Sequence, residues 1–222
     1  MVDGTDGAVI YPLINDVPAL VYMANLAALE LHTPQWRTPD EGAPVRLSPQ
    51  VLIDQVVMDL DPGADVTMPL IALAALLVAG EFAEAGLRAY PKTSGHKGIQ
   101  VYAPVAPTPA GSALTYITSV AGTLMTRHPE LFVTTVSKEA RAGKILLDIN
   151  QNLPGRTTVS VYSLRAGATP TVSTPLTWDE VEAASEGAPL TFTAPDVLER
   201  VHRDGDLFAA VLTDQRPSLP AP

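Results

Sequence analysis

The chain has 222 residues, of which 46% are hydrophobic, so it is long enough for one domain, or a tight pair of subdomains, with a substantial core. It has no cysteine, which excludes disulfides and thiolate metal sites, and its 14 basic and 24 acidic residues give a net charge of −10. Proteins that bind nucleic acid gain much of their affinity from basic residues. Any binding of nucleic acid by this acidic chain therefore has to use a local basic surface, a metal ion or a partner protein.

The ends and composition of the chain indicate its broad class. The N-terminal residues are acidic and polar, unlike a signal peptide, and the longest apolar run, residues 69–80, is too short to cross a bilayer. We therefore expect a soluble, cytoplasmic protein. Its 21 prolines and 15 glycines favour short elements joined by many turns.

The first part of the chain predicts two helices with a strand between them. Apolar residues at three- and four-residue spacing predict a helix over residues 17–32, with Asp16 as N-cap and His32 at its C-terminal end. A histidine at a helix C-terminus is stabilised by the helix dipole, and on position alone this explains why a histidine occurs at residue 32. Residues 56–60 are typical of a buried strand, and residues 69–89 predict a largely buried helix.

The strand at residues 56–60 carries two aspartates, Asp59 and Asp61, before a break at Pro62. Residues i and i+2 of a strand point to the same side, so the two carboxylates project together. Their repulsion requires compensating positive charge, for which a divalent cation is suited. A strand that ends in a polar turn explains the same residues equally well, and the tripeptide alone leaves both interpretations open.

A Lys-Thr-Ser-Gly-His-Lys-Gly segment, residues 92–98, lies between predicted strands over 88–91 and 99–105. In such a turn glycines let the backbone approach an anion, the Ser94 hydroxyl donates a hydrogen bond, and Lys97 supplies positive charge. The segment lacks the spacing of a P-loop and no helix follows it. An ordinary charged hairpin is the alternative interpretation.

Helices and short strands alternate in the second half of the chain. The predicted helices cover residues 108–128, a segment capped by Thr177, 194–204 and 206–212, and the predicted strands cover 131–136, 144–150 and 157–164. We expect residues 1–212 to form one domain. The proline-rich residues 213–222 are expected to be disordered.

Three charged residues of the second half are candidates for a site. Asp148 lies within the apolar strand at 144–150, where a charge is costly unless it is paired or metal-bound, so Asp148 is the natural third metal ligand. Arg141 belongs to a basic turn before that strand, and Arg165 follows the last predicted strand.

Five motifs, taken in their order along the chain, carry a resemblance to a known family. They are Asn25-Leu-Ala-Ala-Leu-Glu-Leu-His32-x-Pro-x-Trp36, Asp59-Leu-Asp61-Pro-Gly, Lys92-Thr-Ser94-Gly-x-Lys97-Gly, Leu147-Asp148 and Tyr162-Ser-Leu-Arg165. Together they resemble the polymerase domain of bacterial ligase D, of the archaeo-eukaryotic primase superfamily, which serves in non-homologous end joining. The likeness extends from about Tyr11 to Leu212. It implies the primase-polymerase fold, a mixed α/β fold whose central sheet contains antiparallel pairs and is flanked by helices.

The resemblance also implies a function and its residues: template-dependent addition of ribo- or deoxyribonucleotides to a primer 3′-hydroxyl, for gap filling. Asp59, Asp61 and Asp148 would bind two divalent ions, Mn²⁺ or Mg²⁺, in a two-metal mechanism. The incoming nucleotide would be held by His32, Ser94, Lys97, Arg141 and Arg165. The implied partners are an NTP or dNTP, primer-template DNA with gaps or broken ends, Ku and an ATP-dependent DNA ligase, and the implied location is the cytoplasm, at the nucleoid.

Two features differ from the family pattern. The relatives have a basic segment before the position that matches Tyr11, and superfamily members often have a histidine where this chain has Gln100. A second hypothesis is therefore a truncated or split module that binds metal and nucleotide but needs another polypeptide to bind DNA. A third is a metal-dependent phosphoesterase that uses the same three acids.

Overall fold

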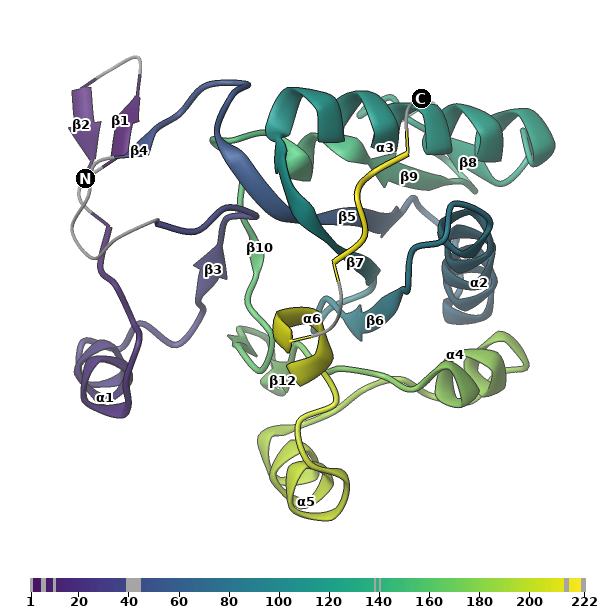
Figure 1. The fold of residues 1–222 in the computed structure, drawn as a ribbon. Helices are drawn as coiled ribbons and strands as arrows, with labels where there is room; N and C mark the ends of the chain where they lie inside the picture. Colours follow the sequence, from purple (N-terminus) through teal and green to yellow (C-terminus); the bar gives the residue numbers. More distant parts are fainter. Residues whose placement is uncertain are drawn as a thin grey trace.

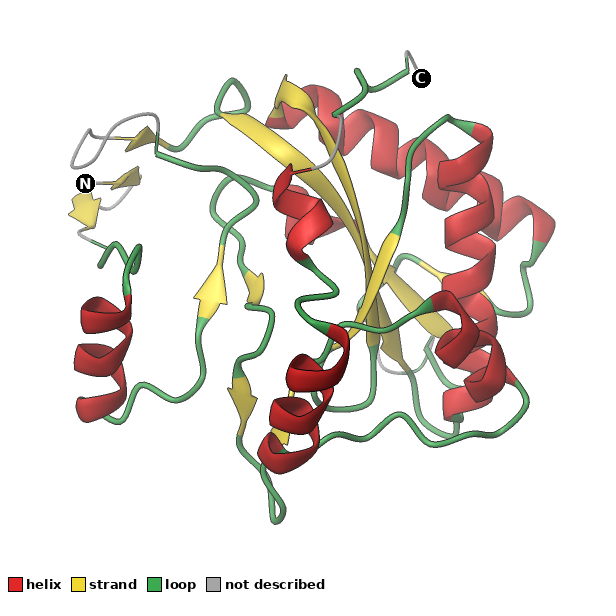
Figure 2. Ribbon diagram, turned by 60° about the horizontal axis from the view of Figure 1, so that its bottom comes forward, coloured by secondary structure: helices red, strands yellow, loops and turns green. Residues whose placement is uncertain are grey.

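A five-stranded sheet forms the centre of the computed structural model, which describes residues 2–4, 7–9, 11–38, 45–137, 139, 141–213 and 216–220. Its strands lie in the order β6-β7-β5-β9-β8, and every neighbouring pair is antiparallel except the parallel pair β8 and β9. The strands are β5 (Leu52–Pro62), β6 (Tyr90–Thr93), β7 (Ile99–Pro109), β8 (Phe132–Val133) and β9 (Ile145–Asp148). Figures 1 and 2 show this sheet with helices around it, which confirms the predicted mixed α/β fold.

The two faces of the sheet have different coverings. On one face Val56, Met58 and Leu60 of β5 pack with α2 (Met68–Glu84) and α3 (Ala110–Arg127) in the main core. On the other face, Val57 of β5 packs in a smaller apolar cluster with Tyr90, Tyr102, Phe208 and Val211. Since strand residues alternate between faces, Asp59 and Asp61 belong to the face of Val57, opposite α2 and α3.

Several predicted helices are observed with small changes of boundary. The predicted helices over 69–89 and 108–128 correspond to α2 and α3. The helix capped by Thr177 is α4 (Trp178–Ser185), which begins with a capping box between Thr177 and Glu180, and α5 spans Ala194–Asp204 as expected. The last predicted helix is shorter, α6 (Ala209–Thr213). Among the described residues no helix is both long and apolar enough to cross a membrane.

The first helix is shorter than the sequence predicts. Asp16 does cap α1 (Val17–Asn25), since its side chain accepts a hydrogen bond from the amide of Ala19 at 2.8 Å, but the helix ends at Asn25. His32 lies instead in β3 (His32–Thr33), which pairs with β10 (Thr158–Val159). None of the side chains of α1 is buried. Apolar packing therefore does not stabilise the longer helix that the periodicity predicts.

The strand predictions of the second half are also corrected. The run predicted over 157–164 is interrupted after β10, where Tyr162 has a φ of 64°, and it resumes as β11 (Leu164–Arg165), paired with β12 (Thr171–Val172). Arg165 is therefore part of a strand. The strand predicted over 144–150 ends at Asp148, which caps the 3₁₀ helix η1 (Ile149–Asn152).

Two peripheral segments complete the fold. A small sheet combines β1 (Val2–Gly4), β2 (Gly7–Val9) and β4 (Val45–Arg46). Near the C-terminus, residues 216–220 lie in the tail for which disorder is expected. There the carbonyl of Pro217 accepts a hydrogen bond from Ala106 at 2.9 Å, and the side chain of Arg216 pairs with Asp54. These contacts hold this part of the tail against the β5–β7 pair.

Candidate active site

The three candidate acids meet on one face of the central sheet. Asp59 of β5 is the direct cross-strand partner of Asp148 of β9, and Asp61 lies opposite Leu146. Residues opposite each other in an antiparallel pair point to the same face, with Cβ atoms about 4.5–5.5 Å apart. The pairing thus brings Asp148 beside Asp59, and the two-residue period adds Asp61 on the same face.

A continuous row of polar side chains crosses four strands at this point. Lys92 of β6 is paired with Gln100 of β7, Gln100 is paired with Asp59, and Asp59 is paired with Asp148. The ammonium of Lys92 donates a hydrogen bond of 2.5 Å to Oε1 of Gln100, and the Gln100 side chain is hydrogen-bonded to Asp59. Gln100 and Lys92 are both buried. The row therefore runs from a buried cation to a pair of carboxylates.

Burial and crowding alter the acidity of Asp59. Desolvation raises the pKa of Asp59 to about 6, the nearby charges of Asp148 and Asp61 also raise it, and the hydrogen bond from Gln100 and the charge of Lys92 act in the opposite direction. Negative charge is thus concentrated where the two strands meet. A bound cation would stabilise the ionised carboxylate.

The other two acids are engaged by neighbouring donors. Asp61 Oδ2 accepts a hydrogen bond of 2.7 Å from Nη2 of Arg141, and the two side chains form an ion pair. Asp148 accepts from the amide of Asn150 at 3.1 Å and from Nε2 of Gln151 at 2.9 Å. In this arrangement, no three acidic or histidine side chains of the described residues are grouped as metal ligands. The donor chemistry, three carboxylates on one face, still fits a hard divalent ion such as Mg²⁺ or Mn²⁺.

The turn that carries Ser94 and Lys97 packs directly on the acidic strand. A Cβ at Gly98 would lie 2.5 Å from the carbonyl oxygen of Leu60, the residue between the two aspartates, so only glycine allows this approach. Ser94 Oγ accepts hydrogen bonds from the amides of Gly98 at 3.1 Å and His96 at 3.3 Å. These two bonds use the oxygen lone pairs of Ser94 and not its proton, which can be donated to a ligand, while Lys97 is exposed to solvent.

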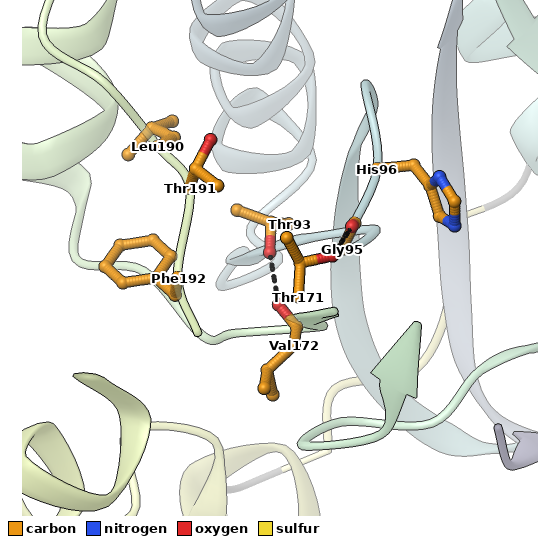
Figure 3. A pocket seen from close by; sticks show the side chains of 8 residues that line it. All are labelled: Thr93, Gly95, His96, Thr171, Val172, Leu190, Thr191 and Phe192. Atoms are coloured by element: carbon orange, nitrogen blue, oxygen red, sulfur yellow. Dashed lines mark hydrogen bonds between the residues drawn. The ribbon is translucent and has the colours of Figure 1, made fainter. Parts of the chain in front are cut away.

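The same turn contacts Arg165. Gly95 has a φ of 76°, and a Cβ there would lie 2.4 Å from Cγ of Arg165. Figure 3 shows a small hollow beside the turn, where the Thr171 hydroxyl donates to the carbonyl of Gly95 and the Thr93 hydroxyl donates to the carbonyl of Val172. These two hydrogen bonds hold the turn against β12.

His32 and Arg165 share an acidic partner. Oε1 of Glu30 lies 2.8 Å from Nη1 of Arg165 and 3.0 Å from Nε2 of His32, and the two nitrogens are 3.4 Å apart. Hydrogen bonding to His32 and the charge of Arg165 lower the pKa of Glu30, against the opposing effect of burial. The segment reaches Arg165 because the amide of Leu31 donates to Ser163 Oγ at 2.8 Å.

The structure therefore groups the predicted residues into neighbouring sets. Asp59 and Asp148 lie together, Asp61 is paired with Arg141, and His32 lies with Arg165, which also contacts the turn of Ser94 and Lys97.

Three residues of this region were missed by sequence reasoning: Glu30, Lys92 and Gln151. The sequence pattern assigns Lys92 to the turn, whereas it lies in β6, facing the site. The available signal is the two-residue spacing from Tyr90, which puts Lys92 and Tyr90 on the same face of a strand. Nothing local in the sequence indicated that Glu30 would meet Arg165.

Comparisons with known proteins give a consistent result. The family described as LigD, primase-polymerase domain, matches residues 2–208. The chain is 38% identical over 209 residues to the multifunctional non-homologous end joining protein LigD of Mycobacterium bovis and 31% identical to the bifunctional LigD of Bacillus subtilis. These matches cover 94% and 91% of this chain, but 27% and 32% of the relatives' own length.

A solved structure is similar as well. The polymerase domain from Mycobacterium tuberculosis ligase D in complex with DNA superposes with a TM-score of 0.83 at 37% sequence identity. The similarity covers 96% of this chain and 71% of that chain. Sequence and fold thus agree over nearly the same region.

Proposed function

This chain belongs to the LigD primase-polymerase domain family, and we propose that it is a template-dependent nucleotidyltransferase that adds nucleotides to a primer 3′-hydroxyl. The single observation that carries this proposal is the register of β5 and β9, which sets Asp148 opposite Asp59 with Asp61 on the same face. The solved relative, whose title states that it is in complex with DNA, supports DNA as the substrate class.

Asp59, Asp61 and Asp148 would hold the divalent ions, Mn²⁺ or Mg²⁺. Two bound ions would supply charge stabilisation for both the attacking and the leaving oxygens of the phosphoryl transfer. The side chains would mainly position the reactants, because such a transfer depends on alignment and on neutralisation of charge.

Five further groups would hold the nucleotide, chiefly its triphosphate. The guanidinium groups of Arg165 and Arg141 suit phosphate as planar forks, and Nε of each is buried without a hydrogen-bond partner in the described part of the chain. Lys97 would add a solvent-facing point charge, and Ser94 would donate its free hydroxyl proton. His32 would act beside Arg165.

Primer extension tests the proposal. The chain is incubated with Mn²⁺, ribo- or deoxyribonucleotides and a gapped primer-template, and the product lengths are measured. Asp59→Asn and Asp148→Asn are expected to abolish extension, whereas Asp179→Asn, on the exposed side of α4, is expected to leave it unchanged. Folded wild-type protein that extends no primer would reject the proposal for this chain, and release of phosphate without added nucleotide would favour a phosphoesterase.

The wider role proposed is gap filling during bacterial non-homologous end joining, with Ku and an ATP-dependent DNA ligase as partners and the nucleoid as location. The names of the relatives support this role, although the chain spans only 27% to 32% of the two relatives compared above.

A second candidate is a module that binds metal and nucleotide but relies on another polypeptide to bind DNA. The net charge of −10 favours it. Calorimetry that shows nucleotide binding together with negligible affinity for the gapped DNA would select this alternative.

A further inference from the structure

A buried lysine on the site face is not used by the proposed mechanism. Lys92 is 1% exposed, and within the described ranges only Lys92 and Arg200 among the basic residues are buried. Its ammonium donates to three acceptors: Gln100 Oε1 at 2.5 Å, Ser173 Oγ at 2.7 Å and the carbonyl of Val159 at 2.9 Å. An ammonium has three N–H donors, so this environment matches the charged form in full.

When Lys92 is protonated, as it is below about pH 7, the direction of each hydrogen bond around it is determined. An ammonium only donates, and the Ser173 hydroxyl is itself committed to the carbonyl of Thr93 at 2.8 Å, so Ser173 Oγ has to accept from Lys92. In the same way, the oxygen of the Gln100 amide has to face Lys92, because the opposite orientation would set an NH₂ group against the ammonium. The NH₂ group of Gln100 then faces Asp59, to which it is hydrogen-bonded.

We propose that Lys92 is a positioning residue of the active site, which fixes the Gln100 amide so that its N–H group holds the carboxylate of Asp59 in place. This inference rests on the proposed function only where it concerns Asp59 as a metal ligand. Residues that hydrogen-bond to metal ligands and hold them in orientation strongly affect metal affinity. Their substitution commonly lowers metal affinity about ten- to a hundredfold.

The energetics of the site support a specific use for this side chain. Burial lowers the pKa of Lys92 to about 7, while the charge of Asp59 acts to raise it. A buried charge is costly unless hydrogen bonds and opposite charge compensate it, and the three acceptors of Lys92 supply such compensation. The competing explanation is structural: Lys92 would serve only to attach the segments of Val159 and Ser173 to β6.

A nuclear magnetic resonance measurement on the metal-free protein tests the orientation directly. The side-chain NH₂ resonances of Gln100 are assigned by their loss in Gln100→Leu and then compared between the wild type and Lys92→Met. The proposal predicts that these resonances shift and exchange faster with solvent in Lys92→Met, since the amide loses its fixed oxygen partner. Unchanged resonances in a folded Lys92→Met protein would overturn it.

Calorimetric titration with Mn²⁺ alone, at one fixed pH below 7 where Lys92 is protonated, tests the consequence for Asp59. Lys92→Met and Gln100→Leu are each expected to weaken Mn²⁺ binding about tenfold, and the double variant no further than Gln100→Leu alone. Arg200→Met is the matched control: it removes the other buried cation, which pairs with Glu180, and should change stability but not Mn²⁺ affinity.

The outcomes separate the two proposals. Wild-type Mn²⁺ binding that Asp59→Asn removes but Lys92→Met leaves unchanged would overturn the positioning role and leave the proposed function standing. Equal losses from Lys92→Met in the wild-type and Gln100→Leu backgrounds would show that Lys92 does not act through the amide. If Lys92→Met does not fold, Gln100→Leu decides the matter, because unaltered Mn²⁺ affinity in that variant contradicts the proposal. Absence of Mn²⁺ binding by the wild type would reject the metal site and the proposed function that depends on it, whereas the Gln100 resonances of the metal-free protein would still decide whether Lys92 orients the amide.

Discussion

Nη2 of Arg141 lies 2.7 Å from Oδ2 of Asp61, so a candidate phosphate ligand is paired with a candidate metal ligand. Arg141 also donates to the carbonyls of Asp61 and Pro62, each at 3.4 Å. The two side chains neutralise each other. Under the proposed function, a divalent ion at Asp61 would replace the guanidinium and leave it free for the nucleotide.

Arg141→Gln is expected to change two affinities in opposite directions. Nucleotide binding should weaken about ten- to a hundredfold, because a charge-assisted hydrogen bond contributes about 1.5–3 kcal/mol. Mn²⁺ binding without nucleotide should strengthen by up to about fivefold, because the exposed pair that competes for Asp61 contributes about 0.2–1 kcal/mol. Calorimetry measures both, with Arg127→Gln, on an exposed ion pair with Glu81, as the control. A parallel loss of both affinities would contradict the exchange.

Asp59→Asn is expected to stabilise the protein near neutral pH while it abolishes activity. The pKa of Asp59 is about 6 in the folded protein and 3.8 when unperturbed, so the folded state binds more protons between these values. Stability therefore falls as pH rises from about 4 to 6, by about 1–3 kcal/mol.

Urea unfolding of the wild type and of Asp59→Asn at pH 4 and pH 7.5 measures this contribution. The variant should lack it, so the difference in stability between the two proteins should grow with pH. The same difference at both pH values would show that the Asp59 carboxyl is not desolvated in the folded state.

Lys92 adds a dependence of the opposite sign at higher pH. Its pKa is about 7 in the folded protein against 10.5 when unperturbed, so the unfolded state binds more protons between these values. Wild-type stability should rise with pH above 7, with a slope of at most about 1.4 kcal/mol per pH unit. Lys92→Met should remove this rise, which thermal or urea unfolding between pH 7 and 9.5 would detect. A rise of equal size in Lys92→Met would assign it to other groups.

Glu30→Gln is expected to improve nucleotide binding. The carboxylate of Glu30 accepts from both Arg165 and His32, so it competes with phosphate for their N–H groups and repels it. With an exposed pair contributing about 0.2–1 kcal/mol, the nucleotide dissociation constant should fall by up to about fivefold.

The control for this effect is Glu186→Gln, an equal change of charge at the exposed end of α4. The gain should also shrink at high salt, because screening weakens exposed pairs. Weaker nucleotide binding by Glu30→Gln would instead assign Glu30 a supporting role for Arg165.

Local patterns determined much of this protein. The alternation of β5 was enough to place Asp59 and Asp61 on one face, and the capping residues Asp16 and Thr177 marked real helix starts. These features depend on neighbours within one turn or two strand positions, which a sequence displays directly. The family followed from the order of the motifs, and the roles of the site residues remain proposals.

Only the tertiary structure decided which side chains meet. Asp148 stands opposite Asp59 because β9 pairs with β5 in one register, and a shift of a single residue would turn it to the other face. The same pairing of β6, β7 and β5 connects Lys92 through Gln100 to Asp59. Periodicity states which way a residue faces along its own strand, whereas the partner across the sheet is selected by packing between segments distant in the chain.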